Sequence, residues 1–212
     1  TVSDAVGDDL INAMGIVAHE MLTIYNPFDV AQIQQRAQAE NPFAGEEYIL
    51  HIGRFHQVKR QDRLLEAFAQ AKLPTKLVIV GQGEAAVTQQ LQAKIEQLNL
   101  QQQVVLAGFA KNPLPILKGA RLFALSSDSE GLPTVLIESL ICGTPIVSTA
   151  CPGGVGEIMV GELAAYQADL NAASMAEKLR LGWQSPPDIT PAMYAKFDIN
   201  LIIDRYLDLA VK

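Results

Sequence analysis

The sequence has few of the residues on which several broad classes of protein depend. Its 212 residues include two cysteines, Cys142 and Cys151, too few for a disulfide framework or a structural zinc site. No apolar run approaches the roughly 18 to 20 residues that a transmembrane helix needs. Basic residues are also scarce, because 16 Lys and Arg stand against 23 Asp and Glu and give a net charge of −7. A general nucleic-acid binder or a polybasic membrane-surface module needs a broad cationic surface, so both classes are excluded.

The rest of the composition is that of a folded α/β protein. Hydrophobic residues make up 49% of the chain and charged residues 18%, which supplies a core and argues against disorder. The sequence shows neither a signal peptide nor a lipidation motif, so we expect a reducing, cytoplasmic setting. The chain begins at Thr1 without an initiator Met, and we expect that something upstream has been removed. An anionic ligand must be held by a local basic cluster.

From residue 48 onward, short apolar runs alternate with helical patterns. The runs are continuous rather than alternating, which is typical of parallel strands covered by helices on both faces. We therefore expect an α/β fold with an open, doubly wound, Rossmann-like parallel sheet, and a ligand at the carboxyl ends of its strands. Strands are predicted at 48–53, 76–81, 104–106, 122–125 and 145–148, and helices at 62–71, 84–98, 113–118 and 132–142.

The two ends of the chain do not follow this alternation. At the start, the pattern predicts helices at 4–14 and 29–38 and a strand at 22–25. At the far end, Ser185-Pro186-Pro187 separates a last helix, at about 191–211, from the body.

The first candidate site residues follow the strand at 48–53. Gly53 allows close approach to the backbone, and Arg54 and Lys59 supply cationic donors in a chain otherwise rich in carboxylates. This set suits a diphosphate. The alternative is that these basic residues are simply solvated at the end of a strand-to-helix loop.

Gly81 and Gly83 form a second strand-to-helix motif. They resemble the start of a dinucleotide fingerprint, but no third glycine follows at the required spacing, and no suitable acidic residue ends the next strand. A tight turn that lets a ligand approach the backbone is therefore plausible, whereas NAD binding is not supported.

The segment from Glu130 to Glu138 carries a third candidate site. Pro133 suits the first turn of a helix, and the free N–H groups at the helix start, beside Gly131, suit an anion. Two carboxylates about two helical turns apart lie roughly 10 Å from each other along the axis. That separation is too long for a retaining glycosidase pair but fits one extended ligand, with a sugar at one end and a ribose at the other. The alternative is that Glu130 only complements the helix dipole and Glu138 faces water.

Glycines also follow the strand at 145–148. Three of the four positions 153–156 are glycine, which indicates that this backbone passes close to a neighbouring group. They are Gly153, Gly154 and Gly156. Cys151 precedes them, and because no histidine is placed as its partner we interpret it as a buried, inert thiol.

Together these segments resemble the C-terminal domain of the retaining glycosyltransferases of family 4 (group 1), which have the two-domain GT-B fold. The resemblance covers about residues 1–160, with the pieces in the family's order. They are Gly53-Arg54 with Lys59, Val80-Gly81-Gln82-Gly83, Gly108-Phe109, the E-x7-E motif of Glu130 and Glu138, Gly143-Thr144-Pro145, and Gly153-Gly154 with Glu157.

The resemblance implies a role for each motif residue. Arg54 and Lys59 would bind the donor diphosphate and, with Glu130, form the catalytic set. Glu130 would contact the hydroxyls of the transferred sugar, and Glu138 the ribose hydroxyls. Phe109 and its neighbours would meet the base through backbone groups, and no metal or other cofactor is expected. The remaining donor-binding residues would be Gly53, Gly81, Gly83, Gly131, Leu132, Thr134 and Val135.

The resemblance also implies what lies around this domain. Residues 1–14 would be a remnant or linker of a missing N-terminal acceptor domain, 15–190 the donor-binding domain, and 191–212 a helix that packs toward the missing half. The donor would be a nucleotide sugar, most often UDP-linked, and the acceptor a glycan or glycolipid in surface polysaccharide synthesis. Peripheral attachment of the full-length protein at the inner membrane face is left open.

One departure from the family and two alternatives accompany this interpretation. Lys59-Arg60 stands where the family often has Lys-Gly, which puts the phosphate geometry of this loop in question. A non-catalytic, doubly wound ligand-binding or interaction module is the first alternative, and it predicts solvated Glu130 and Glu138. A nucleotide-sugar epimerase of similar fold is the second, although the histidine or carboxylate set it needs cannot be placed.

Overall fold

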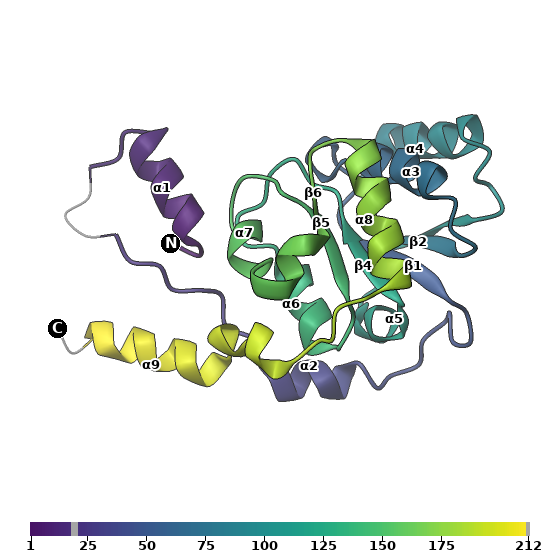
Figure 1. Ribbon diagram of the computed structural model, residues 1–212. Coiled ribbons are helices and arrows are strands. Elements are labelled where there is room, and N and C mark those ends of the chain that lie inside the picture. The colour runs from purple at the N-terminus through teal and green to yellow at the C-terminus, as the bar shows by residue number, and fades with distance from the viewer. Residues whose placement is uncertain (18–20, 211–212) are drawn as a thin grey trace.

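The computed structural model describes residues 1–17 and 21–210, and its centre is a six-stranded parallel sheet (Figure 1). The strand order is β3-β2-β1-β4-β5-β6, so the chain reverses its direction of travel across the sheet between β1 and β4. This arrangement confirms the doubly wound α/β fold predicted from the sequence. The strands are β1 Tyr48–Ile52, β2 Lys76–Val80, β3 Val104–Gly108, β4 Leu122–Leu125, β5 Ile146–Thr149 and β6 Gln167–Ala168.

The sheet holds the core of the protein because its central strands are buried on both faces. In the register, Ile49 of β1 lies opposite Leu77 of β2, and Leu50 lies opposite Phe123 of β4. All four of these side chains are fully buried. Parallel pairing brings the carboxyl ends of β1 to β5 to one edge, where the loops that follow them meet.

One face of the sheet is covered by α3 (Gln61–Ala71), α4 (Ala85–Gln97) and α8 (Ala172–Gln184). α3 packs against both of the others, and it buries Phe68 as part of its apolar side. The Asn171 side chain begins α8 by accepting a hydrogen bond from the Ser174 amide, as an N-cap residue does. Neither α8 nor the short strand β6 was predicted from the sequence.

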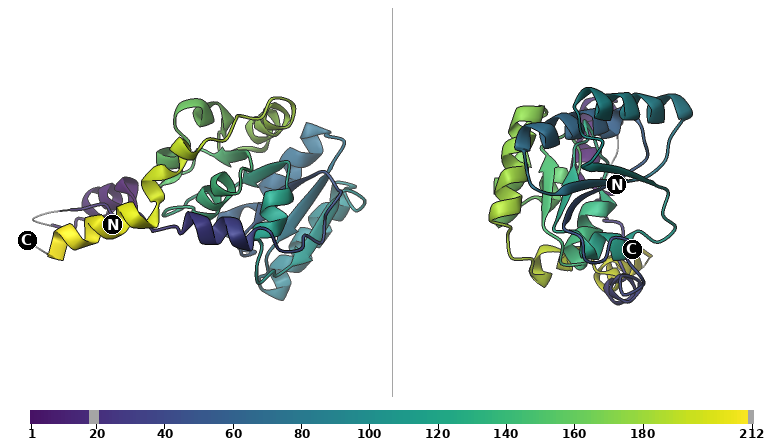
Figure 2. Two further views of the ribbon diagram at one scale, coloured as in Figure 1. Left: turned by 90° about the horizontal axis from the view of Figure 1, so that it is seen from below. Right: turned by 90° about the vertical axis from the view of Figure 1, so that its right-hand side faces the viewer.

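The opposite face carries α2 (Val30–Arg36), α5 (Leu114–Gly119) and α6 (Thr134–Ile141), as Figures 1 and 2 show. These three helices contact one another. Asp29 begins α2 by accepting a hydrogen bond from the Gln32 amide. Short helical segments fill the connections: η1 Gln57–Lys59, α7 Val155–Ile158, η2 Gly161–Tyr166, η3 Pro191–Met193 and η4 Ala195–Phe197.

The first and last helices, α1 (Asp4–Asn12) and α9 (Ile199–Ala210), lie beyond one end of the sheet, at the left of Figure 1. The segment between α1 and α2 pairs with the segment just before α9. The Phe28 amide donates to the Phe197 carbonyl at 2.9 Å, and the Ile199 amide donates to the Phe28 carbonyl at 3.0 Å. No described helix has the length and apolar character needed to span a bilayer.

Two predictions for the chain ends are wrong. Residues 22–25 form no strand; the Ile24 amide instead donates to the Thr1 carbonyl at 2.9 Å in an irregular segment. The helix predicted at 191–211 is divided, because η3 and η4 come first and α9 begins at Ile199. Residue 211 lies outside the described residues.

His51 is fully buried in β1 and held by two contacts. Its Nδ1 lies 2.9 Å from the Ala124 carbonyl oxygen of β4, so this nitrogen carries the proton of the neutral ring, and its Nε2 lies 3.4 Å from the side-chain nitrogen of Gln61. Burial lowers the pKa of His51 from 6.5 to about 4. The ring is therefore neutral at pH 7.

We predict that acid weakens the fold through His51. The unfolded chain takes up this proton near pH 6.5 and the folded chain only near 4, so the free energy of unfolding falls as the pH drops through that window. The expected slope is about 1.4 kcal/mol per pH unit. Urea unfolding at several pH values measures it, and His51→Gln should flatten the profile by that amount. Equal slopes in the two proteins would contradict the assignment.

Candidate functional site

A cavity of about 720 Å³ opens at the carboxyl edge of the sheet, between the loops that follow β1, β2 and β3. Five residues predicted from the sequence line it, and they come from three separate motifs: Gly53, Arg54, Gly81, Gly83 and Phe109. Ala110, a neighbour of Phe109, also lines it, as do three residues that were not predicted from the sequence: Glu84, Lys111 and Pro113. Of these, Lys111 had a usable signal, because it is a cation shortly after a strand end.

Gly81 and Gly83 bring the loops after β1 and β2 into contact. A Cβ atom at Gly81, whose φ is +155°, would lie 1.9 Å from the Gly53 carbonyl oxygen. At Gly83 it would lie 2.4 Å from the Phe55 carbonyl oxygen. These glycines therefore let the loop after β1 approach the loop after β2 closely, and the cavity lies beside this contact.

Lys59 and Glu130 form an ion pair beside the cavity. The distance from Lys59 Nζ to Glu130 Oε1 is 2.7 Å, and the Glu130 side chain is only 10% exposed. The hydroxyl of Ser127 donates to the same oxygen at 2.5 Å. The stem of Lys59 passes Gly53, because a Cβ there would lie 3.8 Å from Lys59 Cγ. The structure thus unites two residues that are 71 positions apart, on loops that follow neighbouring strands.

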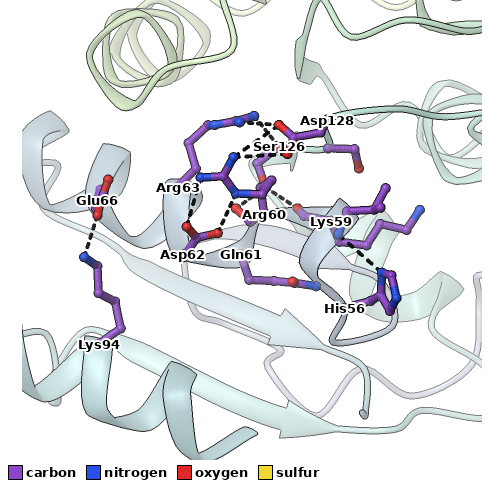
Figure 3. A network of polar contacts seen from close by, with 12 residues as sticks. His56, Lys59, Arg60, Gln61, Asp62, Arg63, Glu66, Lys94, Ser126 and Asp128 are labelled. Carbon is purple, nitrogen blue, oxygen red and sulfur yellow. Dashed lines mark hydrogen bonds and ion pairs between the residues drawn. The ribbon is translucent and has the colours of Figure 1, made fainter. Parts of the chain in front are cut away.

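Arg60 occupies the place where a glycine was expected, and its backbone is left-handed with φ of +48°. The side chain reaches two carboxylates: Nε lies 3.0 Å from Asp62 Oδ1, and Nη1 lies 3.1 Å from Asp128 Oδ2 (Figure 3). These hydrogen bonds raise the pKa of Arg60 further above its usual range. Arg60 therefore has a left-handed backbone of the kind that glycine favours, and its side chain links the loops after β1 and β4.

The start of α6 differs from the prediction. The helix begins at Thr134 rather than at Leu132, whose side chain belongs to the core, and Pro133 precedes it. No side chain caps this end of the helix, so the amides of Thr134 and Val135 lie in an uncapped first turn. Glu130 lies well outside the helix, which removes the basis for a 10 Å helical separation between the two glutamates.

Glu138 lies in the second turn of α6 and is half-buried. Burial raises the pKa of its carboxyl, and the charge of Arg36 on α2 opposes that rise. Glu138 is not one of the residues that line the 720 Å³ cavity or contact the Lys59–Glu130 pair in the described part of the chain. Its predicted contact with a ribose stays a prediction.

The glycine cluster after β5 packs against the loop that carries Glu130. This is the kind of close approach that the glycines in the sequence predict. Gly153 has φ of +102°, and a Cβ there would lie 1.5 Å from the Glu130 carbonyl oxygen. The Gly154 amide donates to Gly131 at 2.7 Å. Cys151 is buried, and burial raises the pKa of its thiol to about 11, in agreement with an inert cysteine.

A second cavity, of about 660 Å³, lies between the start of α3 and α4. His56, Arg60, Asp62, Lys94 and Asp128 are among its lining residues. Its charged groups are engaged with one another or with Glu66, as Figure 3 shows. Across residues 1–17 and 21–210, no three His, Cys, Asp or Glu side chains gather as a metal site would require.

Residues 32–190 match the family described as "Glycosyl transferases group 1". An N-acetylgalactosamine-N,N'-diacetylbacillosaminyl-diphospho-undecaprenol 4-alpha-N-acetylgalactosaminyltransferase of Campylobacter jejuni is 35% identical over 151 residues, which cover 71% of this chain and 40% of that protein. A lipopolysaccharide 1,6-galactosyltransferase of Escherichia coli is 27% identical over 164 residues, which cover 74% and 44%. The chain spans less than half the length of these relatives.

The fold is also that of solved structures. The crystal structure of Anabaena Alr3699/HepE in complex with UDP and glucose superposes with a TM-score of 0.86 at 22% identity, over 100% of this chain and 62% of that chain. The apo form of the lipopolysaccharide outer core galactosyltransferase WaaB gives a TM-score of 0.79 at 19% identity, over 98% and 60%. Likeness at this level of identity shows a shared fold.

We predict that Gly153→Ala destabilises the protein, because the new Cβ would collide with the Glu130 carbonyl and the backbone is left-handed. Strain and overpacking together should cost about 2 kcal/mol or more of unfolding free energy. Gly156→Ala is the matched control, since a Cβ there has open space and the φ is ordinary. Urea unfolding measures both. Equal stabilities of the two variants would show that the Gly153–Glu130 contact is not as close as described.

Proposed function

Because the chain belongs to the group 1 glycosyl transferases, we propose that it is the donor-binding half of a retaining, family 4 glycosyltransferase with the GT-B fold. Its donor is a nucleotide diphosphate sugar, with UDP as the nucleotide. Through the part of the enzyme that lies outside this chain, the sugar passes to an acceptor glycan or glycolipid hydroxyl in surface polysaccharide or glycolipid synthesis.

One observation carries this proposal. Residues from three distant motifs line a single cavity at the carboxyl edge of the sheet, and the Lys59–Glu130 pair stands beside it. Doubly wound folds bind nucleotides at the carboxyl edge of the sheet, beside the point where the strand order reverses. Here that point lies between β1 and β4, whose following loops carry Lys59 and Glu130. The UDP assignment is further supported by the Anabaena structure, whose chain has the same fold and holds UDP and glucose.

The charges near the cavity suit a diphosphate. Arg54 lines the cavity and takes part in none of the ion pairs found among the described residues, so its guanidinium is available to a ligand. Lys59 is already neutralised by Glu130 and must share its ammonium group with an incoming phosphate. We further propose that the uncapped amides of Thr134 and Val135 donate to the ligand from the start of α6. Arg54 and Lys59 would supply the local cationic donors that a chain with a net charge of −7 needs to hold a diphosphate.

These groups act when the donor bond breaks. Transfer breaks the bond between the anomeric carbon and the diphosphate oxygen, and forms one from that carbon to the acceptor oxygen. The acceptor hydroxyl gives its proton to the departing diphosphate. The leaving diphosphate gains negative charge, which Arg54 and Lys59 stabilise. Glu130 accepts a hydrogen bond from a hydroxyl of the transferred sugar, and Glu138 from the ribose. Phe109 lines the cavity, and it meets the base through its backbone groups.

Calorimetric titration with UDP, ADP and GDP tests the proposal. We expect selective UDP binding, and we expect Arg54→Ala and Lys59→Ala each to weaken it by about 1 to 3 kcal/mol, the range for charge-assisted hydrogen bonds. Lys76→Ala is the control, because Lys76 is an exposed cation at the amino end of β2, away from the carboxyl edge.

Three other results of this titration have distinct meanings. Unchanged affinity in both variants would remove the diphosphate assignment. Selective binding of ADP or GDP would keep the nucleotide site but change the donor. If no nucleotide bound to this chain or to the full-length protein, the non-catalytic interaction module would become the better interpretation.

A separate prediction concerns Glu138. If its carboxylate contacts the ribose, Glu138→Ala should weaken UDP binding more than pyrophosphate binding, because pyrophosphate has no ribose. Glu138→Gln should give an intermediate loss, since the amide keeps one acceptor oxygen. Competition calorimetry compares the two ligands for each variant. Equal losses for UDP and pyrophosphate would remove the ribose contact.

A further inference from the structure

Arg63 is a buried guanidinium near the start of α3, and it is 4% exposed. A buried arginine is costly unless its donors are paired. Nη1 of Arg63 donates to the Ser126 carbonyl oxygen at 2.9 Å, and Nη2 donates to a carboxylate oxygen of Asp128. Both partners lie in the loop after β4, so Arg63 binds a neighbouring loop rather than its own helix (Figure 3).

The same loop is bound to the loop after β1 by further hydrogen bonds. The Ser126 hydroxyl contacts the carbonyl oxygens of Lys59 and Arg60 at 2.8 and 3.0 Å. The Asp128 amide donates to the Val58 carbonyl at 2.8 Å. The Arg60 guanidinium contacts the second oxygen of the Asp128 carboxylate at 3.1 Å. Arg63 and Arg60 thus hold one carboxylate from two sides.

Glu130 lies two residues beyond Asp128 in the chain. Its ion-pair partner, Lys59, directly precedes Arg60. The segment that Arg63 grips therefore leads straight to one member of the pair, and the segment bound to it carries the other. Among the described residues, Arg63 makes no hydrogen bond or ion pair with either member itself.

We propose that Arg63 is a positioning residue, which sets the distance between Lys59 and Glu130 by fixing the 126–128 backbone. The inference rests on the proposed function, in which Lys59 binds the diphosphate and Glu130 the sugar. Its physical basis is that a planar guanidinium can bind a carbonyl and a carboxylate at once in a fixed geometry. The ammonium group of a lysine cannot reproduce that arrangement.

A double-mutant cycle on UDP affinity tests this role. Arg63→Met should weaken UDP binding roughly tenfold in the native background, the size of one lost interaction. In the Lys59→Ala background the same change should have less than about a twofold effect, because the residue through which Arg63 acts is gone. In the Arg54→Ala background the effect should remain tenfold. Arg63→Lys should restore little.

Two further variants separate positioning from a general loss of stability. Asp128→Asn weakens the same contact from a half-buried position, and it should reproduce the pattern of the cycle even if Arg63→Met folds poorly. Arg121→Met is the matched control. Arg121 also joins a carboxylate, that of Glu47, to a backbone carbonyl, that of Trp183, but it does so at the start of β4. Its loss should leave UDP affinity unchanged.

Amide NMR spectra without nucleotide make the test independent of the proposed function. Arg63→Met and Asp128→Asn should shift the signals of residues 58–60 and 126–131, and Arg121→Met should not. Absence of these shifts overturns the positioning role whether or not UDP binds. With a native chain that binds UDP, an effect of Arg63→Met that persists undiminished in the Lys59→Ala background also overturns it. A native chain that does not bind UDP counts against the proposed function, and the spectra then decide on the positioning role.

Discussion

The loops after β1 and β4 are held against each other, and the candidate site depends on this contact. The two strands are neighbours at the point where the strand order reverses, so parallel pairing places their carboxyl ends side by side. Hydrogen bonds from Ser126 and Asp128 then join the loops. On the other side, Gly153 lets the loop after β5 lie against Glu130. Lys59 and Glu130 are therefore paired by the sheet and its loops together.

Local sequence pattern was sufficient for most of the fold. Continuous apolar runs occur where strands are buried on both faces, and the motif glycines mark where loops approach one another. The same reasoning failed at residues 22–25. This apolar run does not form a strand, and its Ile24 amide donates to the Thr1 carbonyl. It also placed the start of α6 too early, because Leu132 is apolar and fits a helix pattern although its side chain belongs to the core.

The arrangement of charges could not be derived in the same way. Four basic residues follow β1: Arg54, Lys59, Arg60 and Arg63. The sequence pattern assigned a diphosphate to Arg54 and Lys59, but it did not predict which carboxylate any of the four contacts. In the structure Lys59 is paired with Glu130, and the two following arginines share Asp128, while Arg54 lines the cavity. Ion pairs between residues about 70 positions apart depend on which strands are neighbours, so they follow from topology and not from spacing.

The most direct measurement of the central claim is amide chemical-shift mapping while UDP is added to the protein. The account predicts that the largest changes fall on residues 53–54, 81–84 and 109–111, which line the cavity at the carboxyl edge of the sheet. Changes centred instead on His56, Gln90 and Lys94 would place the nucleotide in the second cavity and contradict the account.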